Sequence, residues 1–378
     1  MNANQFSAAD QVFMGQALGL ASDGLFTADP NPRVGCVLVR DGEVVGTGAH
    51  LKAGEPHAER HALAAAGERA RGATCYVTLE PCAHTGRTGP CADALVDAGV
   101  ARVVAAMQDP NSQVAGRGFA RLKAAGIEVS VGLMEPQARA LNPGFIRRME
   151  TGLPFVRVKL AMSLDGRTAM ASGESKWITG AAAREQVQRL RARSSAIITG
   201  IGTVLADDPA MTVRPDSWQG QPYPPMAVRQ PLRVVLDRRL RAPADMAMLQ
   251  EGGHTLLVTA ADADPSRARL LQERGAGLLH LPASGSGVDL HQLLRELGQR
   301  ECNEVLVEAG PTLAAAFMNE NLVDELVVFM APALLGSNAR PLMVLPELAT
   351  MADRIALTFQ AVERVGDDLC LTLVRAQH

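Results

Sequence analysis

The most constraining feature of the sequence is a repeated alternation of short apolar runs with segments rich in Ala, Glu, Arg and Leu. Short apolar runs are typical of buried strands, and the segments between them have the composition of helices. Alternation at these lengths predicts an α/β fold, in which helices cover a layered sheet. In the first 130 residues the strand-like runs are 34–39, 74–79, 100–107 and 127–131, and the helical segments are 8–21, 57–70, 91–97 and 118–125.

The alternation is interrupted once, near residue 150. Turn-forming residues cluster at Asn142-Pro143-Gly144 and again at Gly152-Leu153-Pro154, and a second series of strands and helices follows. A chain of 378 residues is also longer than one hydrophobic core usually serves. We therefore predict two domains, residues 1–150 and 151–378. Within the second, the Pro- and Gln-rich stretch 214–231 predicts a loop, and Gly366-Asp367-Asp368 predicts a hairpin.

Composition narrows the class of function. A net charge of -3 and an aromatic content of 3% argue against a protein that binds nucleic-acid phosphates and stacks on bases. No apolar run reaches the length of a membrane span, and the first ten residues lack the pattern of a secretory signal. We therefore expect a soluble, cytoplasmic chain with small-molecule substrates and no nucleic-acid or membrane partner. The sequence leaves open whether it forms a homo-oligomer.

Four of the six cysteines lie in the first quarter of the chain, which indicates a metal site because a reducing compartment disfavours disulfides. His57 opens a helical segment, Cys82 follows a strand through a Pro-Cys turn, and Cys91 opens the next helix. One imidazole and two thiolates suit zinc and leave a fourth position for water, which zinc activates near neutral pH. Glu59 is placed to take a proton from that water and pass it to a leaving amine. These parts predict hydrolysis of an amino group from a heterocyclic ring.

Less specific explanations exist for each of these residues. The two cysteines also fit buried apolar positions. A closed structural zinc site would use His84, Cys75 or His50 as a fourth ligand. Upstream, Asn31 belongs either to a plain turn before a strand or to the site, where it would hydrogen-bond the edge of the substrate ring.

The pattern H-A-E, followed by P-C and a second cysteine, resembles the zinc-dependent cytidine deaminase superfamily. The chain departs from that signature because eight residues, instead of two, separate Cys82 from Cys91. This insertion contains His84, a competing ligand, and Arg87 and Thr88, which suit contacts to an anionic substrate. A second departure is Gly89-Pro90-Cys91, where relatives usually carry Pro-Pro-Cys.

The second half lacks the Gly-x-Gly-x-x-Gly fingerprint, since Leu205 follows Gly200-Ile201-Gly202 at the place of the third glycine. A different anion device is visible after the strand-like run 304–307. There Gly310 allows close backbone approach, Pro311 fits the first helical turn, and free N–H groups at the helix start favour a phosphate. The same residues also fit an ordinary helix start.

Several further segments carry a resemblance to the riboflavin-pathway reductases, which have a dihydrofolate-reductase-like fold and use NADPH. They are Lys159 to Arg167, Ser175-Lys176-Trp177-Ile178-Thr179, Gly202 to Pro209, Met211 to Arg214, and Glu308 to Thr312. With the deaminase-like half in front, nearly the whole chain resembles the family of bifunctional riboflavin biosynthesis deaminase–reductases. The resemblance implies a cytidine-deaminase-like three-layer domain followed by the reductase domain.

The same resemblance implies two reactions and their residues. The first half would deaminate 2,5-diamino-6-(5-phosphoribosylamino)pyrimidin-4-one with zinc on His57, Cys82 and Cys91, and with Glu59 moving protons. The second would use NADPH to reduce the ribosyl group of 5-amino-6-(5-phosphoribosylamino)uracil to a ribityl chain. Cofactor-contacting positions are Ala161, Trp177, Thr203, Asp207, Gly310, Pro311, Thr312, Leu313, Ala314, Ala315 and Ala316. The implied substrate-contacting positions are Ser175, Arg191, Met211, Arg214 and Glu308. Asn31, interpreted above from its own position, is the candidate substrate contact of the first half.

The chemistry of these residue types agrees with the implied roles. Arg191 and Arg214 can hold a phosphate through paired donors, and Trp177 can stack on a nicotinamide ring. The alternatives are that Arg191 and Arg193 form a solvated helix face and that Trp177 belongs to the core. Arg238 follows a strand where the family tends to carry a small polar residue, and it would favour the 2′-phosphate of NADPH.

Two other functions compete with this interpretation. A deaminase acting on a base in tRNA fits the first half alone, and the acidic balance disfavours it. A zinc-stabilised scaffold without activity is the other, and a Glu59→Gln variant would separate it from an enzyme.

Overall fold

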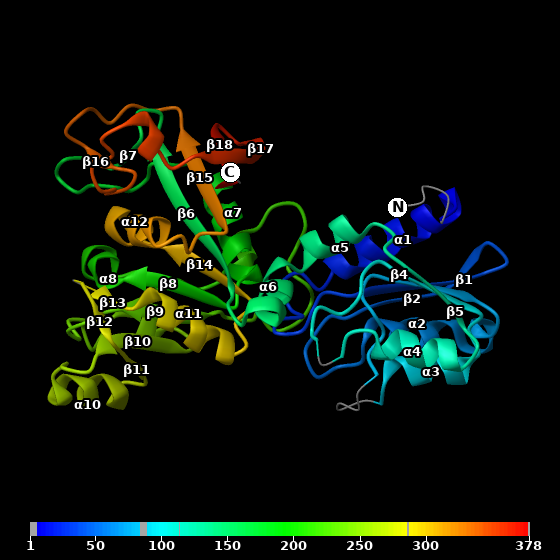
Figure 1. Cartoon of the computed structure of the whole chain (residues 1–378). Coiled ribbons are helices and arrows are strands. Elements are labelled where there is room, and N and C mark those ends of the chain that lie inside the picture. The colour runs from blue at the N-terminus through cyan, green and yellow to red at the C-terminus, as the bar shows by residue number, and fades with distance from the viewer. Residues whose placement is uncertain (1–5, 84–88, 113, 286, 377–378) are drawn as a thin grey trace. The chain divides into compact units, whose positions relative to one another are not determined.

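The computed structural model describes residues 6–83, 89–112, 114–285 and 287–376 (Figure 1). The chain divides into two compact units, Met1–Leu153 and Pro154–His378. The predicted boundary at residue 150 falls inside helix α6 (Pro143–Thr151), because the turn-like Asn-Pro-Gly sequence starts a helix instead of breaking the chain. Proline suits a first helical position, where no backbone donor is needed, and Gly152 ends the helix with φ 75°.

Unit 1 is built on a five-stranded sheet in the order β2-β1-β3-β4-β5. Strand β1 is antiparallel to both of its neighbours, whereas β3, β4 and β5 run parallel to one another. The carboxyl ends of β3 and β4 therefore lie side by side at one edge. The strands are β1 (Gly35–Arg40), β2 (Glu43–Ala49), β3 (Thr74–Val77), β4 (Arg102–Ala105) and β5 (Glu128–Val131).

Helices cover both faces of this sheet in three layers (Figure 1). On one side lie α1 (Ala8–Ser22) and α5 (Glu135–Leu141), and on the other α2 (Ala58–Ala66), α3 (Cys91–Ala98) and α4 (Arg117–Ala124). Helix α2 approaches β2 closely, because a Cβ at Gly46 or Gly48 would lie 2.2 Å from a backbone oxygen of the helix. This close packing fixes the start of α2, which carries His57 and Glu59, against the sheet.

Unit 2 is built on a nine-stranded sheet in the order β11-β10-β9-β8-β14-β6-β15-β18-β17. The first seven strands are parallel, and the last two form an antiparallel hairpin at the edge. The strands are β6 (Phe155–Ser163), β8 (Ala196–Gly200), β9 (Leu232–Leu236), β10 (Thr255–Ala260), β11 (Gly277–Leu281), β14 (Glu304–Glu308), β15 (Glu325–Ala331), β17 (Leu357–Val365) and β18 (Asp368–Arg375).

The connections of unit 2 are mostly helical. The helices are α7 (Ala181–Arg193), α8 (Ile201–Asp207), α9 (Ala247–Gln250), α10 (Pro265–Glu273), α11 (Leu290–Gln299) and α12 (Pro311–Asn319). Two small two-stranded sheets are formed by β7 (Arg167–Ala169) and β16 (Arg340–Pro341), and by β12 (Ala283–Ser284) and β13 (Gly287–Val288). The predicted α/β class is confirmed in both units, and so is the hairpin at Gly366. Strand β15, which pairs with β6, was not predicted.

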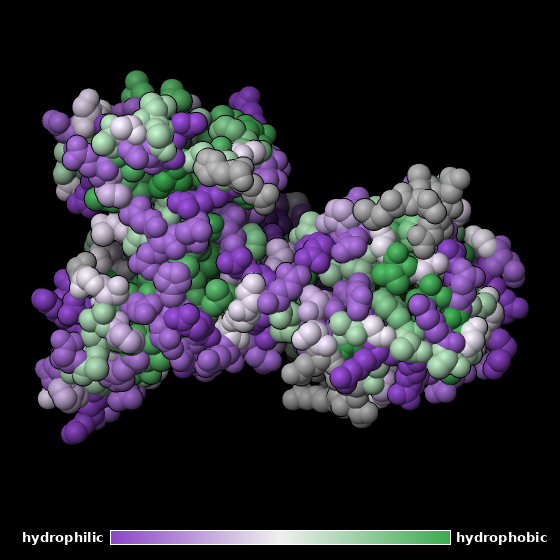
Figure 2. Space-filling model, in the orientation of Figure 1, coloured by the Kyte–Doolittle hydropathy of each residue, from purple (hydrophilic) through white to green (hydrophobic). Residues whose placement is uncertain are grey.

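The surface of the molecule is largely hydrophilic on the face drawn in Figure 2. On the face drawn in Figure 2, hydrophilic residues cover most of both units, and apolar residues form small scattered areas. None of the helices in the described residues combines the length and the apolarity that a membrane crossing requires.

Candidate active sites

Three side chains converge at the carboxyl edge of the unit 1 sheet. His57 is the residue that precedes α2, Cys91 is the first residue of α3, and Cys82 lies on the segment that follows β3. His57 Nδ1 lies 3.7 Å from Cys82 Sγ and 3.4 Å from Cys91 Sγ, and all three ligand atoms lie within 4.8 Å of one another. Bond lengths of about 2.0–2.3 Å place the ligand atoms of a tetrahedral zinc roughly 3.5–3.8 Å apart. The donor set and its spacing therefore fit zinc.

The protonation of the two thiols is shaped by their contact with each other and with the backbone. The Cys91 thiol, the His57 ring and the Cys91 backbone N–H, which lies 3.3 Å from Cys82 Sγ, lower the pKa of Cys82 to about 4. The same contact with Cys82 raises the pKa of Cys91. A thiolate is thus stabilised at Cys82, and thiolates are the form in which cysteines bind metals.

Glu59 lies in the first turn of α2 and is 3% exposed. Burial raises the pKa of its carboxyl group, and its side chain contacts Cys91. A desolvated carboxyl beside the ligand cluster is suited to accept and return a proton. The structure thus brings together all four residues that the sequence assigned to this centre.

The residues considered as a fourth zinc ligand have other partners where the structure describes them. His50 Nε2 lies 3.0 Å from Asn31 Nδ2, and His50 Nδ1 lies 3.2 Å from the carbonyl oxygen of Pro56. Cys75 Sγ lies 3.5 Å from Cys36 Sγ inside the core. Neither residue joins the cluster, which has three members among the described residues. His84, Arg87 and Thr88 lie outside the described residues.

A second cluster of charged groups lies at the carboxyl edge of β14 in unit 2. Arg191 of α7 donates to Glu308, the last residue of β14, through Nε at 2.6 Å and Nη2 at 2.9 Å. Arg193 forms a second ion pair at the amino end of β14, with its Nε 2.9 Å from Glu304 Oε2 and its Nη2 donating to Glu304 Oε1 at 3.3 Å. The alternative of a solvated helix face is therefore wrong, because the partners of both arginines are buried carboxylates. The two predicted substrate contacts Arg191 and Glu308 are bound to each other.

Lys159 is a member of this cluster that the sequence did not single out. It lies on β6 directly beside Glu308 in the strand register. Burial lowers the pKa of its ammonium group, Glu308 raises it, and Arg191 lowers it further. The signal in the sequence was a lysine that, with Arg157, interrupts the largely apolar run of β6.

The predicted cofactor contacts lie on four segments: β6, the segment that carries Trp177, α8 and the start of α12. Trp177 is 71% exposed, so it does not belong to the core, and the Arg184 guanidinium lies 4.8 Å from the centre of its ring. The neighbouring Lys176 lies 3.8 Å from Asp207 at the end of α8, which also carries Thr203. Ala161 is half-buried on β6. Trp177 therefore presents an open aromatic face beside α8.

The segment 310–316 forms the start of α12. Gly310 precedes the helix, no side chain caps the helix start, and the position that a Cβ of Gly310 would take is open space. Free N–H groups at such a start suit a phosphate. Ala314 and Ala315 are buried in the helix, so a ligand would reach the backbone at its exposed beginning, at Gly310 and Thr312.

The remaining substrate candidates differ in accessibility. Ser175 is half-buried, and Arg214 is exposed, with its backbone N–H donating to Gln188 Oε1 at 2.9 Å. Met211 is 4% exposed and packs in the core, so its side chain is not available to a ligand. Arg238 donates to the carbonyl oxygen of Gly285 at 2.9 Å.

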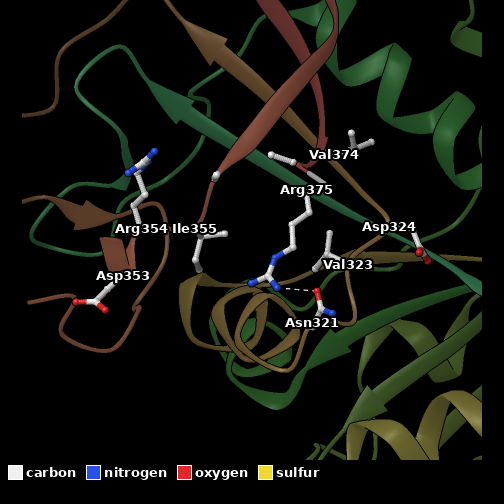
Figure 3. A pocket seen from close by; sticks show the side chains of 10 residues that line it. Asn321, Val323, Asp324, Asp353, Arg354, Ile355, Val374 and Arg375 are labelled. Carbon is white, nitrogen blue, oxygen red and sulfur yellow. Dashed lines mark hydrogen bonds between the residues drawn. The ribbon is translucent and has the colours of Figure 1, made fainter. Parts of the chain in front are cut away.

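A solvent-open hollow of about 680 Å³ lies at the sheet edge of unit 2, where β17 begins and β18 ends (Figure 3). Its lining includes Arg354, Ile355 and Arg375, and Arg375 Nη1 donates to Asn321 Oδ1 at 2.7 Å. None of the predicted site residues lines this hollow.

Comparison with known protein families matches both units. Residues 7–107 match the cytidine and deoxycytidylate deaminase zinc-binding region, and residues 154–371 match the RibD C-terminal domain. The chain is 54% identical to riboflavin biosynthesis protein RibD of Escherichia coli over 370 residues, 97% of this chain and 100% of that protein. It is 50% identical to the Haemophilus influenzae protein of the same name over 371 residues, 97% and 98% of the two chains.

Solved structures extend the similarity to three dimensions. Acinetobacter baumannii RibD, form 1, matches with a TM-score of 0.90 and 47% identity, covering 98% of this chain and 99% of that one. A Thermotoga maritima protein described as a diaminohydroxyphosphoribosylaminopyrimidine deaminase/5-amino-6-(5-phosphoribosylamino)uracil reductase matches with a TM-score of 0.84 and 31% identity, covering 97% and 99%.

Proposed function

Because the chain belongs to the RibD family, we propose which of its residues carry each of the family's two reactions. As a family member it is a riboflavin biosynthesis enzyme that joins a zinc-binding deaminase domain to a reductase domain, which confirms the predicted fold, function and enzyme class. We assign deamination to unit 1 and reduction to unit 2, with the boundary at Leu153.

The substrate proposed for unit 1 is 2,5-diamino-6-(5-phosphoribosylamino)pyrimidin-4-one, in accord with the description of the Thermotoga maritima protein. Hydrolysis breaks the bond between the ring carbon and the exocyclic 2-amino group, forms a carbon–oxygen bond with water, and releases ammonia. Asn31 is proposed to hold the ring edge, with its Nδ2 oriented by His50.

The observation that carries the deaminase proposal is the convergence of His57, Cys82 and Cys91 beside Glu59. Zinc bound by these three ligands supplies Lewis acidity that activates water at neutral pH. Glu59 takes a proton from the attacking water and passes it to the leaving amino group. Its burial keeps this proton transfer away from bulk solvent.

For unit 2 we propose NADPH as the hydride donor and 5-amino-6-(5-phosphoribosylamino)uracil as the substrate. The open start of α12, Trp177 and the Thr203-to-Asp207 face of α8 would hold the cofactor. Arg191, Lys159 and Glu308 carry a formal net charge of +1, which favours a phosphorylated substrate. Arg214 is exposed and available to the phosphate, and Ser175 and the Met211 backbone complete the proposed contacts.

A coupled assay tests both assignments. We expect ammonia release from the diaminopyrimidine substrate, followed by NADPH oxidation that requires the deaminated product. A zinc chelator should abolish the first reaction and leave the second intact when the deaminated product is supplied. NADPH oxidation that ignores the deaminated product would contradict the reductase assignment.

We propose that the enzyme is cytoplasmic and that its partners are small molecules. The support for this proposal is the net charge of -3 and the free cysteines among the described residues.

We further propose that the chain self-associates through the edge strand β17. This strand exposes Phe359 by 60% and Val362 by 56%, and such an edge favours pairing with another copy. Size-exclusion chromatography with light scattering should show a dimer that Phe359→Lys weakens, and a monomeric wild type would contradict this.

A further inference from the structure

A buried glutamate beside the metal ligands has no part in the chemistry described above. Glu80 lies two residues before Cys82 and is 5% exposed. Its Oε2 accepts backbone N–H groups of Asp109 at 3.1 Å and Gly116 at 2.9 Å. Its Oε1 accepts those of Gly118 at 2.9 Å and Phe119 at 3.3 Å. A buried carboxylate is thus held by four donors from the segment after β4 and the first turn of α4, residues 109–112 and 114–119, named here the clamp loop.

The clamp loop lies directly against the segment that carries Cys82, named here the metal loop (78–82). The clamp loop follows β4, whose neighbour in the sheet is β3, and the metal loop follows β3. The backbone N–H of Glu80 also donates to the carbonyl oxygen of Met107 at 3.0 Å. A Cβ at Gly118 would lie 2.0 Å from the carbonyl oxygen of Pro81, so the two backbones pack without a side chain between them.

From this geometry we infer that Glu80 is a positioning residue, which fixes Cys82 for zinc by bonding the metal loop to the clamp loop. The inference rests on the zinc-ligand role proposed for Cys82. Groups that orient metal ligands typically change metal affinity or activity by about 10–100-fold when they are altered. A carboxylate is needed here because it offers about four acceptor sites and no donor. A glutamine would turn an amide NH₂ toward two of the four backbone donors.

The decisive variant is Glu80→Gln in the full chain. We expect the dissociation constant for zinc, measured by competition with a chromogenic chelator, to rise about 10–100-fold. Ammonia release at saturating zinc should fall, whereas the KM for the pyrimidine should change little. The reason is that the substitution displaces Cys82 and leaves the substrate contacts in place. NADPH oxidation by unit 2 should stay at the wild-type rate, which reports on the integrity of the chain.

The matched control is Asp10→Asn, because Asp10 is another buried carboxylate of unit 1 and is 4% exposed. It bonds Tyr76 and Arg102, not the metal loop. We expect this variant to lower the thermal unfolding midpoint without changing zinc affinity. A purely structural Glu80 would behave like Asp10, so equal zinc affinity in Glu80→Gln and the wild type would overturn the inference.

Two further measurements keep the inference testable. If Glu80→Gln does not fold, Glu80→Asp decides, because it retains the charge but shortens its reach, and it should show a smaller loss of zinc affinity. Wild-type zinc affinity in Glu80→Asp would then overturn the inference. If the wild type itself binds no zinc at its three ligands, the proposed deaminase centre fails, and this result is distinct from a failure of Glu80 alone.

Discussion

Each unit contains a buried glutamate at the carboxyl end of a parallel strand, and the two are stabilised in different ways. Glu80, just beyond β3, accepts four backbone N–H groups of the clamp loop. Glu308, at the end of β14, binds the guanidinium of Arg191. Backbone donors fix a loop around ligands without adding a cation that would repel a metal ion. The ion pair instead holds positive groups where an anionic substrate is expected to bind.

The difference predicts how each site fails. In unit 1, the proposed chemistry depends on a few conspicuous groups whose loss should abolish the reaction but leave the fold. In unit 2, the proposed binding depends on charges that also stabilise the core. Substitutions should therefore separate activity from stability in unit 1 and affect both together in unit 2.

The largest effect is expected for Glu59→Gln. Because proton transfer by a positioned side chain contributes about 10²–10⁴-fold, ammonia release should fall by that factor. Zinc content, measured by elemental analysis, and NADPH oxidation should remain at wild-type levels. Normal ammonia release would remove Glu59 from the proposed mechanism, and loss of zinc would reassign it to a structural role.

Breaking the ion pair of unit 2 should reduce stability as well as activity. Arg191→Met leaves Glu308 buried without its partner, so the free energy of unfolding of unit 2 should fall by about 3–5 kcal/mol. Urea unfolding measures the loss of stability, and steady-state NADPH oxidation measures the loss of activity. The double variant Arg191→Met/Glu308→Leu should recover only part of the stability, because Lys159 loses its counter-charge, and none of the reduction. Recovery of reduction in the double variant would show that neither charge serves the substrate.

A smaller effect is expected from acid on unit 1 through Asp10. Burial would raise the pKa of Asp10, but hydrogen bonds from Ser7, Tyr76 and Arg102 outweigh it and lower the pKa to about 2. An unfolded aspartate titrates near 3.9. The stabilisation by ionised Asp10 is therefore complete above about pH 4 and is lost as the pH falls from there toward 2. The difference in unfolding free energy between wild type and Asp10→Asn should shrink over this range, and a constant difference would contradict the linkage.

The smallest effect is expected for Asp207→Asn, which removes the exposed pair with Lys176. Exposed ion pairs contribute at most about 1 kcal/mol, so the rate of reduction should fall by no more than roughly fivefold. Steady-state kinetics with NADPH as the varied substrate measure this, and the effect should appear mainly in KM. An unchanged rate and KM would remove Asp207 from the cofactor contacts.

The sequence identified the candidate metal ligands because their residue types are chemically distinctive. His57, Cys82 and Cys91 occur in order at helix starts and after a strand, so the pattern alone predicted their convergence. Glu80 is adjacent to the same motif and was still missed. An acidic residue between an apolar strand and Pro-Cys does not reveal that its donors lie 29 to 39 residues later.

The sequence pattern could not predict which buried carboxylates pair with which arginines. Arg191 and Arg193 lie on a helix whose composition suits a solvated face, and only the packing of α7 on β14 places them against Glu308 and Glu304. Trp177 was the opposite case, since a large apolar side chain in a short polar segment is as compatible with a core position as with exposure. Residue type alone does not set burial at such positions.

By itself, the sequence determined the α/β class, most of the alternating strands and helices, and the residue types that can bind zinc, because these depend on local periodicity and on side-chain chemistry. Only the tertiary structure decided which buried charges meet, such as Arg191 and Glu308 across 117 residues of chain. Such pairs form where a helix packs on a strand from a distant part of the sequence, and local composition carries no record of that contact.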